Sequence, residues 1–169
     1  MCHAGRSMII LVPRIRRLSN LSQAMVVVRS LGMEAPLERV WRAVTEAEQL
    51  SQWYAPGSPW DIPELRKGAC AWFHHSPNEH HPGTEAVTMR ATISAVDAPR
   101  RFAMRWEFDD GPEGMMTTFL LEEVAGFTYV TMTETGCETE EQTRQTEAGY
   151  TMSLANLKAL LEGGSLPHT

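Results

Sequence analysis

Four histidines lie within eight residues of the chain, in the segment His74-His-Ser-Pro-Asn-Glu-His-His81. Imidazole nitrogens, together with a carboxylate such as Glu79, are ligands that zinc and copper prefer in proteins. Adjacent residues of a strand point to opposite faces of a sheet, so at most one of His74 and His75 can enter the interior. The last two histidines precede a Pro-Gly pair, which is typical of a loop. We therefore expect a solvated hairpin tip and no metal site.

Three other polar residues are candidates for acid–base or ligand-orienting chemistry. Arg105 and Glu107 are two residues apart and share one face of a predicted strand. Because they alternate with Trp106, we expect them on the outward face as a solvated ion pair. The opposite register would bring them into the interior as candidates for acid–base work. Tyr150 is the better interior candidate, because a buried phenol usually finds a hydrogen-bond partner and can orient a ligand carbonyl or hydroxyl.

Sequence motifs for nucleophilic catalysis and for cofactor binding are absent. The chain contains no Gly-x-Ser-x-Gly, no P-loop and no Gly-x-Gly-x-x-Gly, and no Ser, His and Asp in the order of a hydrolase triad. We therefore expect no catalytic residue and no cofactor.

The helices that must position these residues follow from hydrophobic periodicity. Pro36 suits the first turn of a helix, and the apolar residues that follow it have helical spacing, namely Leu37, Val40, Trp41 and Val44. Thr45-Glu-Ala-Glu48 has the spacing of a capping box and predicts a second short helix. Thr139-Glu-Glu-Gln142 is a second capping box and predicts a long helix whose apolar face carries Tyr150, Ser153, Leu154, Leu157, Leu160 and Leu161.

Strand-like segments occupy the start and the middle of the chain. They cover residues 25–33, 70–75, 87–95, 102–108, 115–124 and 127–135, and short turns join most of them. This order predicts an α+β fold in which a curved antiparallel sheet wraps around one long C-terminal helix.

Two segments near the ends of the chain carry a family resemblance. Residues 33–53 combine Ala35-Pro36 with Val40-Trp41 and end in Trp53 shortly before a proline, and residues 149–160 combine Gly149-Tyr150 with spaced leucines. They resemble the opening and closing motifs of the SRPBCC (START-like) superfamily, and within it the branch named for activators of Hsp90 ATPase. Tyr150 stands where tryptophan is frequent. The resemblance covers about residues 25–164 and implies a helix-grip fold, with six or seven strands gripping the last helix and two short helices after the first strand.

The resemblance also implies a cavity between the sheet and the C-terminal helix. We expect Trp72, Met89, Met104, Trp106, Phe119 and Met132 from the strands, and Tyr150 and Leu154 from the helix, to line it. The alternative is that all eight are ordinary core residues.

The resemblance divides the chain into one domain and two tails. Residues 1–24 contain four arginines and no acidic residue, and most of the arginines follow the apolar stretch, unlike those of a secretory signal. We expect a basic tail there, and a transit peptide or an over-extended start remains open. Residues 25–164 form the expected domain, and residues 165–169 a C-terminal tail.

Composition excludes several classes of partner and compartment. The chain has 15 basic and 21 acidic residues, a net charge of −6, which disfavours nucleic acid as a partner. No apolar run is long enough to span a membrane. The three cysteines show no pairing pattern, which favours a reducing compartment, and we expect a cytoplasmic protein.

These observations favour a module that binds a small hydrophobic molecule and has no defined catalytic activity. An enzyme of the polyketide cyclase or aromatase type in the same fold is the first alternative. A cavity with two or more converging titratable side chains would contradict binding without catalysis and favour this enzyme. A chaperone-associated or other protein-interaction module is the second alternative, and a filled core without a cavity would favour it. The named activators have an additional N-terminal domain, which residues 1–24 are too short to form. A homodimer is a further expectation.

Overall fold

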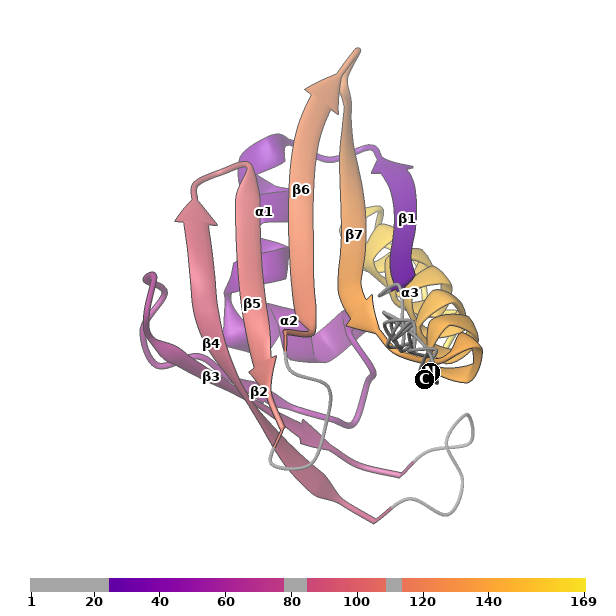
Figure 1. The fold of residues 1–169 in the computed structure, drawn as a ribbon. Helices are drawn as coiled ribbons and strands as arrows, with labels where there is room; N and C mark the ends of the chain where they lie inside the picture. Colours follow the sequence, from indigo (N-terminus) through magenta and orange to yellow (C-terminus); the bar gives the residue numbers. More distant parts are fainter. Residues whose placement is uncertain (1–24, 78–84, 109–113) are drawn as a thin grey trace, which may run out of the picture.

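The computed structural model describes residues 25–77, 85–108 and 114–169 (Figure 1). The elements follow the chain in the order β1 (Met25–Met33), α1 (Leu37–Thr45), α2 (Ala47–Trp53), β2 (Trp60–Asp61), β3 (Cys70–His75), β4 (Val87–Asp97), β5 (Arg101–Glu107), β6 (Met116–Val124), β7 (Phe127–Cys137) and α3 (Glu140–Leu161).

The strands form one antiparallel sheet that curves around the long C-terminal helix. Its order is β1-β7-β6-β5-β4-β3-β2. Strands β2 to β7 therefore form a meander, and the last strand of the chain, β7, pairs with the first, β1. Figure 1 shows α1, α2 and α3 on the same face of the sheet, with α3 behind β1 and β7. The α+β helix-grip architecture expected from the sequence is confirmed, with seven strands.

The two predicted capping boxes have different outcomes. At the start of α3 the Gln142 backbone N–H donates to Thr139 Oγ1 (3.1 Å), and the Gln142 side chain accepts from the Thr139 backbone N–H (3.3 Å). That prediction is confirmed. At Thr45 the predicted second short helix is present as α2, but the capping box does not form, because Thr45 is the buried end of α1 and its hydroxyl donates to the Trp41 carbonyl instead (2.8 Å). The N-cap residue of α2 is Glu46, which makes no side-chain cap.

A dense aromatic and methionine core fills one part of the space between the sheet and the helices. Phe102 and Phe119 lie opposite each other on β5 and β6 and stack with a centroid distance of 5.9 Å. Trp53 from α2 packs edge-on against Phe119 at 6.2 Å and donates its indole N–H to the Ala43 carbonyl (2.8 Å). All three aromatic side chains are fully buried, so this part of the interior is closed.

The outward face of β5 carries the charged pair that the sequence placed there. Arg105 and Glu107 are exposed, and Trp106 between them is buried, so the opposite register is excluded. The ion pair expected between Arg105 and Glu107 is not among those that the described residues form; Glu107 pairs instead across the strands with Arg90 of β4, at 3.4 Å between Oε2 and Nε. Within the described ranges, no helix is long and apolar enough to cross a membrane.

Candidate ligand-binding site

A pocket of about 400 Å³ opens between the sheet and the middle of α3, from Gln145 to Asn156. Small-molecule sites in proteins typically occupy roughly 300–1,000 Å³. Strands β3, β4, β5 and β7 contribute one side of the pocket, α3 another, and the segment after α2 a third. The lining residues are Tyr54, Ala55, Pro56, Phe73, His75, Met89, Trp106, Phe108, Met115, Glu134, Gln145, Thr146, Gly149, Tyr150, Met152, Ser153, Asn156, His168 and Thr169.

Aromatic rings form one wall of the pocket. Tyr54 and Phe73 meet edge to face with a centroid distance of 5.6 Å, and Phe73 meets Trp106 at 6.4 Å. Trp106 stacks on Phe108 at 6.2 Å. The β3–β4 register pairs Phe73 with Met89, which adds a thioether beside the rings. This wall therefore offers flat apolar surfaces to a bound molecule.

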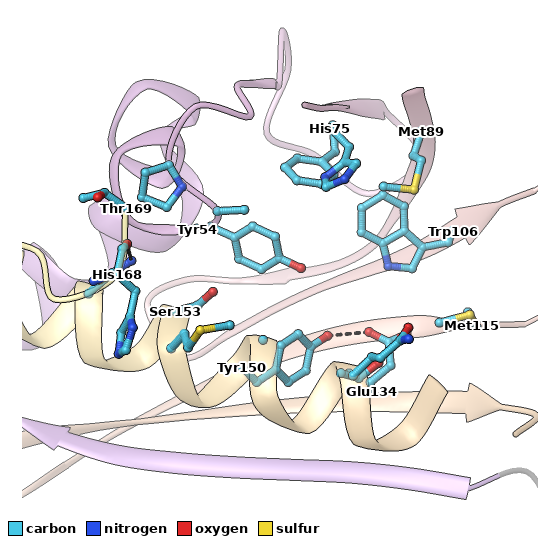
Figure 2. Close-up of a pocket in the computed structure, with 18 of the residues that line it drawn as sticks. Tyr54, His75, Met89, Trp106, Met115, Glu134, Tyr150, Ser153, His168 and Thr169 are labelled. Carbon is cyan, nitrogen blue, oxygen red and sulfur yellow. Dashed lines mark hydrogen bonds between the residues drawn. The ribbon is translucent and has the colours of Figure 1, made fainter. Parts of the chain in front are cut away.

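A buried carboxylate lies at the sheet side of the pocket. Glu134 of β7 is only 2% exposed, and its Oε2 accepts hydrogen bonds from the hydroxyls of Thr117 and Tyr150. The β6–β7 register pairs Thr117 with Glu134, and Tyr150 comes from α3 (Figure 2). Thr117 Oγ1 in turn accepts the indole N–H of Trp106 at 2.9 Å. The second oxygen of the carboxylate, Oε1, is buried and has no hydrogen-bond partner.

Burial shifts the titration of this cluster. Removal from water raises the pKa of Glu134 above its usual value, and the hydrogen bonds from Thr117 and Tyr150 partly oppose that rise. Burial also raises the pKa of Tyr150, which the nearby Tyr54 and Glu134 raise further. Tyr54 shows the same direction, with burial as the largest cause and the charge of Glu134 as the second. Both phenols are therefore neutral at physiological pH.

Gly149 leaves space in the helical wall of the pocket. A Cβ atom built at this position would meet nothing within 4 Å. A glycine inside a helix costs about 0.5–1 kcal/mol relative to alanine. Neither close packing nor an unusual backbone angle requires glycine here, so its effect on the structure is to widen the pocket.

The C-terminal residues form part of the rim. Asn156 of α3 donates to the His168 carbonyl (2.6 Å) and accepts from the His168 backbone N–H (2.9 Å). These bonds bring His168 and Thr169 beside the pocket (Figure 2). The segment 165–169, expected as a tail, thus folds back against α3.

The structure divides the eight residues expected in the cavity into three groups. Met89, Trp106 and Tyr150 line the pocket. Four others are buried in the core and do not line it, namely Met104, Phe119, Met132 and Leu154. Trp72 does not line it either. Its neighbours Ala71 and Phe73 are the buried residues of β3, and alternation turns Trp72 to the opposite face.

Sequence reasoning missed two of the residues that matter most for the pocket. Glu134 is two positions after Met132 and therefore shares its inward face, so the expected strand already contained the signal. Phe73 was missed because the sequence analysis places the larger Trp72 in the interior. In the structure the side chains of β3 alternate the other way, so that Phe73 points inward and Trp72 outward.

The histidine segment contributes one residue to the pocket. His75 lines it, whereas the His74 imidazole Nδ1 lies 3.0 Å from Thr88 Oγ1. The described part of the chain holds no cluster of three or more metal-ligating residues. His80, His81 and Glu79 lie outside the described residues.

Comparisons with known proteins agree with this architecture. The family model described as activator of Hsp90 ATPase homolog 1-like protein matches residues 34–162. Protein MLL2253 from Mesorhizobium loti has a TM-score of 0.70 and 18% identity, over 84% of this chain and 100% of that chain. The Aha1 dimer from Colwellia psychrerythraea has a TM-score of 0.67 and 20% identity, over 83% and 98%.

A third similar structure is CalU16 from Micromonospora echinospora. It has a TM-score of 0.62 and 21% identity, over 85% of this chain and 78% of that chain. Likeness at these identities concerns the fold alone. No curated protein matches the chain by sequence.

Proposed function

The chain belongs to the family of activator of Hsp90 ATPase homolog 1-like proteins, and on that premise we propose that its pocket binds a small, mostly apolar molecule. The observation that carries the proposal is the 400 Å³ space between the sheet and α3. An open pocket of this size with a mostly apolar lining is the usual form of a small-molecule site. A bound molecule would cover the apolar side chains that line it.

The nature of the lining supports an apolar ligand with a polar end. Phe73, Trp106 and Phe108 offer aromatic surface, and Glu134 and Tyr150 offer one compact polar group. Ligand sites commonly combine an apolar lining with a few convergent polar groups that fix orientation. The mid-helix Gly149 gives further support, since the helix keeps a residue of poor propensity where a side chain would narrow the pocket.

An enzyme in the same fold is the second candidate, and one observation favours it. The condition for an enzyme was two or more titratable side chains converging in the cavity, and Glu134 and Tyr150 meet it. A carboxyl group whose pKa is raised by burial is suited to general acid–base catalysis near neutral pH. The pair therefore counts against binding without any catalytic role. Binding of a small molecule remains the first proposal, because both candidates require it and it needs no assumption about a reacting bond.

Native mass spectrometry of the protein purified from its own host tests the proposal. We expect a small molecule to co-purify with the wild-type chain. The Gly149→Leu variant places a side chain in the pocket without a clash at Cβ, and it should lose that molecule while folding at least as stably. Ala148→Leu is the matched control, because Ala148 is exposed and does not line the pocket.

The outcomes separate the candidates. A wild-type chain that carries no molecule, together with no change on adding small aromatic probes, contradicts the binding proposal. A molecule released in chemically altered form favours the enzyme. Equal loss of the molecule in both variants means that the pocket is not its site.

A homodimer is a further proposal for this chain, supported by two observations. The related Aha1 from Colwellia psychrerythraea was solved as a dimer. In this chain apolar side chains lie exposed on neighbouring strands β1, β6 and β7, namely Val26, Val28, Leu120, Val124, Phe127 and Tyr129. Light scattering after size-exclusion chromatography measures the mass directly. The cytoplasmic location stays a prediction.

A further inference from the structure

The hydrogen bonds around Glu134 have a fixed direction. The indole N–H of Trp106 can only donate, so Thr117 Oγ1 is its acceptor at 2.9 Å. Thr117 has one proton of its own, which it directs to Glu134 Oε2, since the Tyr150 hydroxyl is farther away at 3.2 Å. Tyr150 donates to the same oxygen. Oε2 is therefore an acceptor with two donors, and it does not carry the proton of the acid.

The other oxygen of the same carboxylate lacks any partner. Glu134 Oε1 is buried without a hydrogen bond, although the side chain lines the pocket. A buried polar atom without a partner is rare in native proteins, because desolvation costs about 1–3 kcal/mol and more for a charged group. A donor on the ligand would complete the site.

The charges around the pocket indicate which donor fits best. The titratable groups that face Glu134 or share its pocket are Tyr54, His75, Cys137, Tyr150 and His168. No lysine or arginine stands among the pocket residues that the structure describes. The hydrogen bonds that Oε2 of the carboxylate accepts come from hydroxyl groups, which carry no charge, and burying a carboxylate without a closely paired positive charge is unfavourable. A cationic ligand would provide the missing charge.

The aromatic wall favours the same kind of ligand. Tyr54, Phe73, Trp106 and Phe108 surround the space beside the carboxylate. A cation near aromatic faces is attracted by their quadrupoles, and most strongly by that of tryptophan. We propose that the pocket selects a hydrophobic amine, whose ammonium group donates to Glu134 Oε1 while its apolar body lies against the aromatic wall. This inference rests on the proposed binding function.

Three probes of one shape test the inference, namely 2-phenylethylamine, 2-phenylethanol and propylbenzene. Each is titrated into the ¹⁵N-labelled full chain at pH 7, and binding is followed through the amide signals of the pocket residues. We expect the amine to bind about tenfold or more tightly than the alcohol, which is the difference a charge-assisted hydrogen bond makes. Lowering the pH through the raised pKa of Glu134 neutralises the carboxylate, so the preference for the amine should disappear.

The Glu134→Gln variant separates the carboxylate from the rest of the pocket. Its amide oxygen can still accept from Thr117 and Tyr150, and its NH₂ group replaces Oε1. It should lose the tenfold preference for the amine and keep the affinity for the alcohol within about threefold. Glu122→Gln is the matched control, since Glu122 is exposed on β6 and the net charge changes equally.

The outcomes of this experiment are distinct from those of the binding proposal. If the amine binds no more tightly than the alcohol, or keeps its preference in Glu134→Gln, the inference is overturned while the binding function stands. If none of the three probes shifts pocket signals, the binding function itself fails and the inference fails with it. Should Glu134→Gln not fold, the ranking of the probes and its pH dependence in the wild-type chain still decide the matter.

Discussion

The two halves of α3 belong to one regular helix and meet very different surroundings. Residues 140–150 include a single buried side chain, Tyr150, whereas residues 151–161 include Ser153, Leu154, Asn156, Leu157 and Leu161. The first half contributes four residues to the pocket, namely Gln145, Thr146, Gly149 and Tyr150. The second half also reaches the pocket, through Met152, Ser153 and Asn156, but its leucines pack into the closed core. One element thus supplies both the space for a ligand and much of the packing that keeps the fold together.

The difference explains how the fold tolerates an open pocket. The second half buries leucines against the sheet and α2, and Asn156 donates to the Trp53 carbonyl at 3.3 Å. The first half is held by the capping box at Thr139 and by the exposed ion pair between Arg29 and Glu147 at 3.2 Å. Exposed ion pairs contribute little. Stability is therefore concentrated in the second half, and the first half is free to carry the binding groups.

The largest effect is expected from Leu157→Ala in the second half. Leu157 is fully buried, and its truncation should lower the free energy of unfolding by about 2–5 kcal/mol, since transfer energy is lost and a cavity remains. Urea denaturation measures the loss. Leu160→Ala is the control on the same helix, because Leu160 is only partly buried and should cost clearly less. Equal costs for the two variants would contradict the picture of a closely packed second half.

A smaller effect, dependent on pH, is expected from Tyr150→Phe at the pocket. The variant removes one of the two hydroxyl donors to Glu134, at a cost of about 1.5–3 kcal/mol when the carboxylate is charged. Because the pKa of Glu134 is raised in the folded state, stability falls as the pH rises from the unfolded value through the folded one. Loss of the Tyr150 hydroxyl raises that pKa further, so the variant should cost more at pH 7.5 than at pH 4. Urea denaturation at both pH values tests this, and a cost independent of pH would mean that Glu134 is not ionised beside Tyr150.

The smallest effect is expected from Thr139→Ala at the start of the first half. Loss of this N-cap should cost about 1 kcal/mol and weaken the first turns of α3. Hydrogen exchange measures the effect locally, and amides of the first half should exchange faster while those near Leu157 stay protected. Thr139→Asp retains a capping oxygen and should restore protection. Faster exchange along the whole helix would show that the two halves unfold as one unit.

The two capping motifs show how far local sequence patterns determine structure. Thr139 and Thr45 both have a partner of suitable type three residues later, yet only Thr139 forms the box. Thr139 precedes its helix in extended backbone, where its side chain can reach Gln142. Thr45 is the last residue of α1, so its hydroxyl already has an acceptor in the Trp41 carbonyl. The outcome depended on where the preceding helix ends, which the motif itself does not contain.

The site residues illustrate a second limit. Alternation along β7 places Met132 and Glu134 on the same inward face, and the sequence alone predicts that they share it. Met132 is nevertheless closed in the core, while Glu134 lines the pocket. The same division separates Met104 from Trp106 on β5.

The amino-acid sequence by itself determined the order of the elements, the inward faces of most strands, the gripping architecture and the family. Each of these follows from short-range periodicity, turn chemistry or the end motifs around Pro36 and Tyr150. Only the tertiary structure decided which inward side chains meet one another and which meet open space. Whether an inward side chain meets another or open space depends on the local distance between the curved sheet and α3. All the side chains between the sheet and the helix set that distance together. The network of Trp106, Thr117, Glu134 and Tyr150 arises in the same way, because its bonds depend on the registers between three neighbouring strands and on how α3 packs against them.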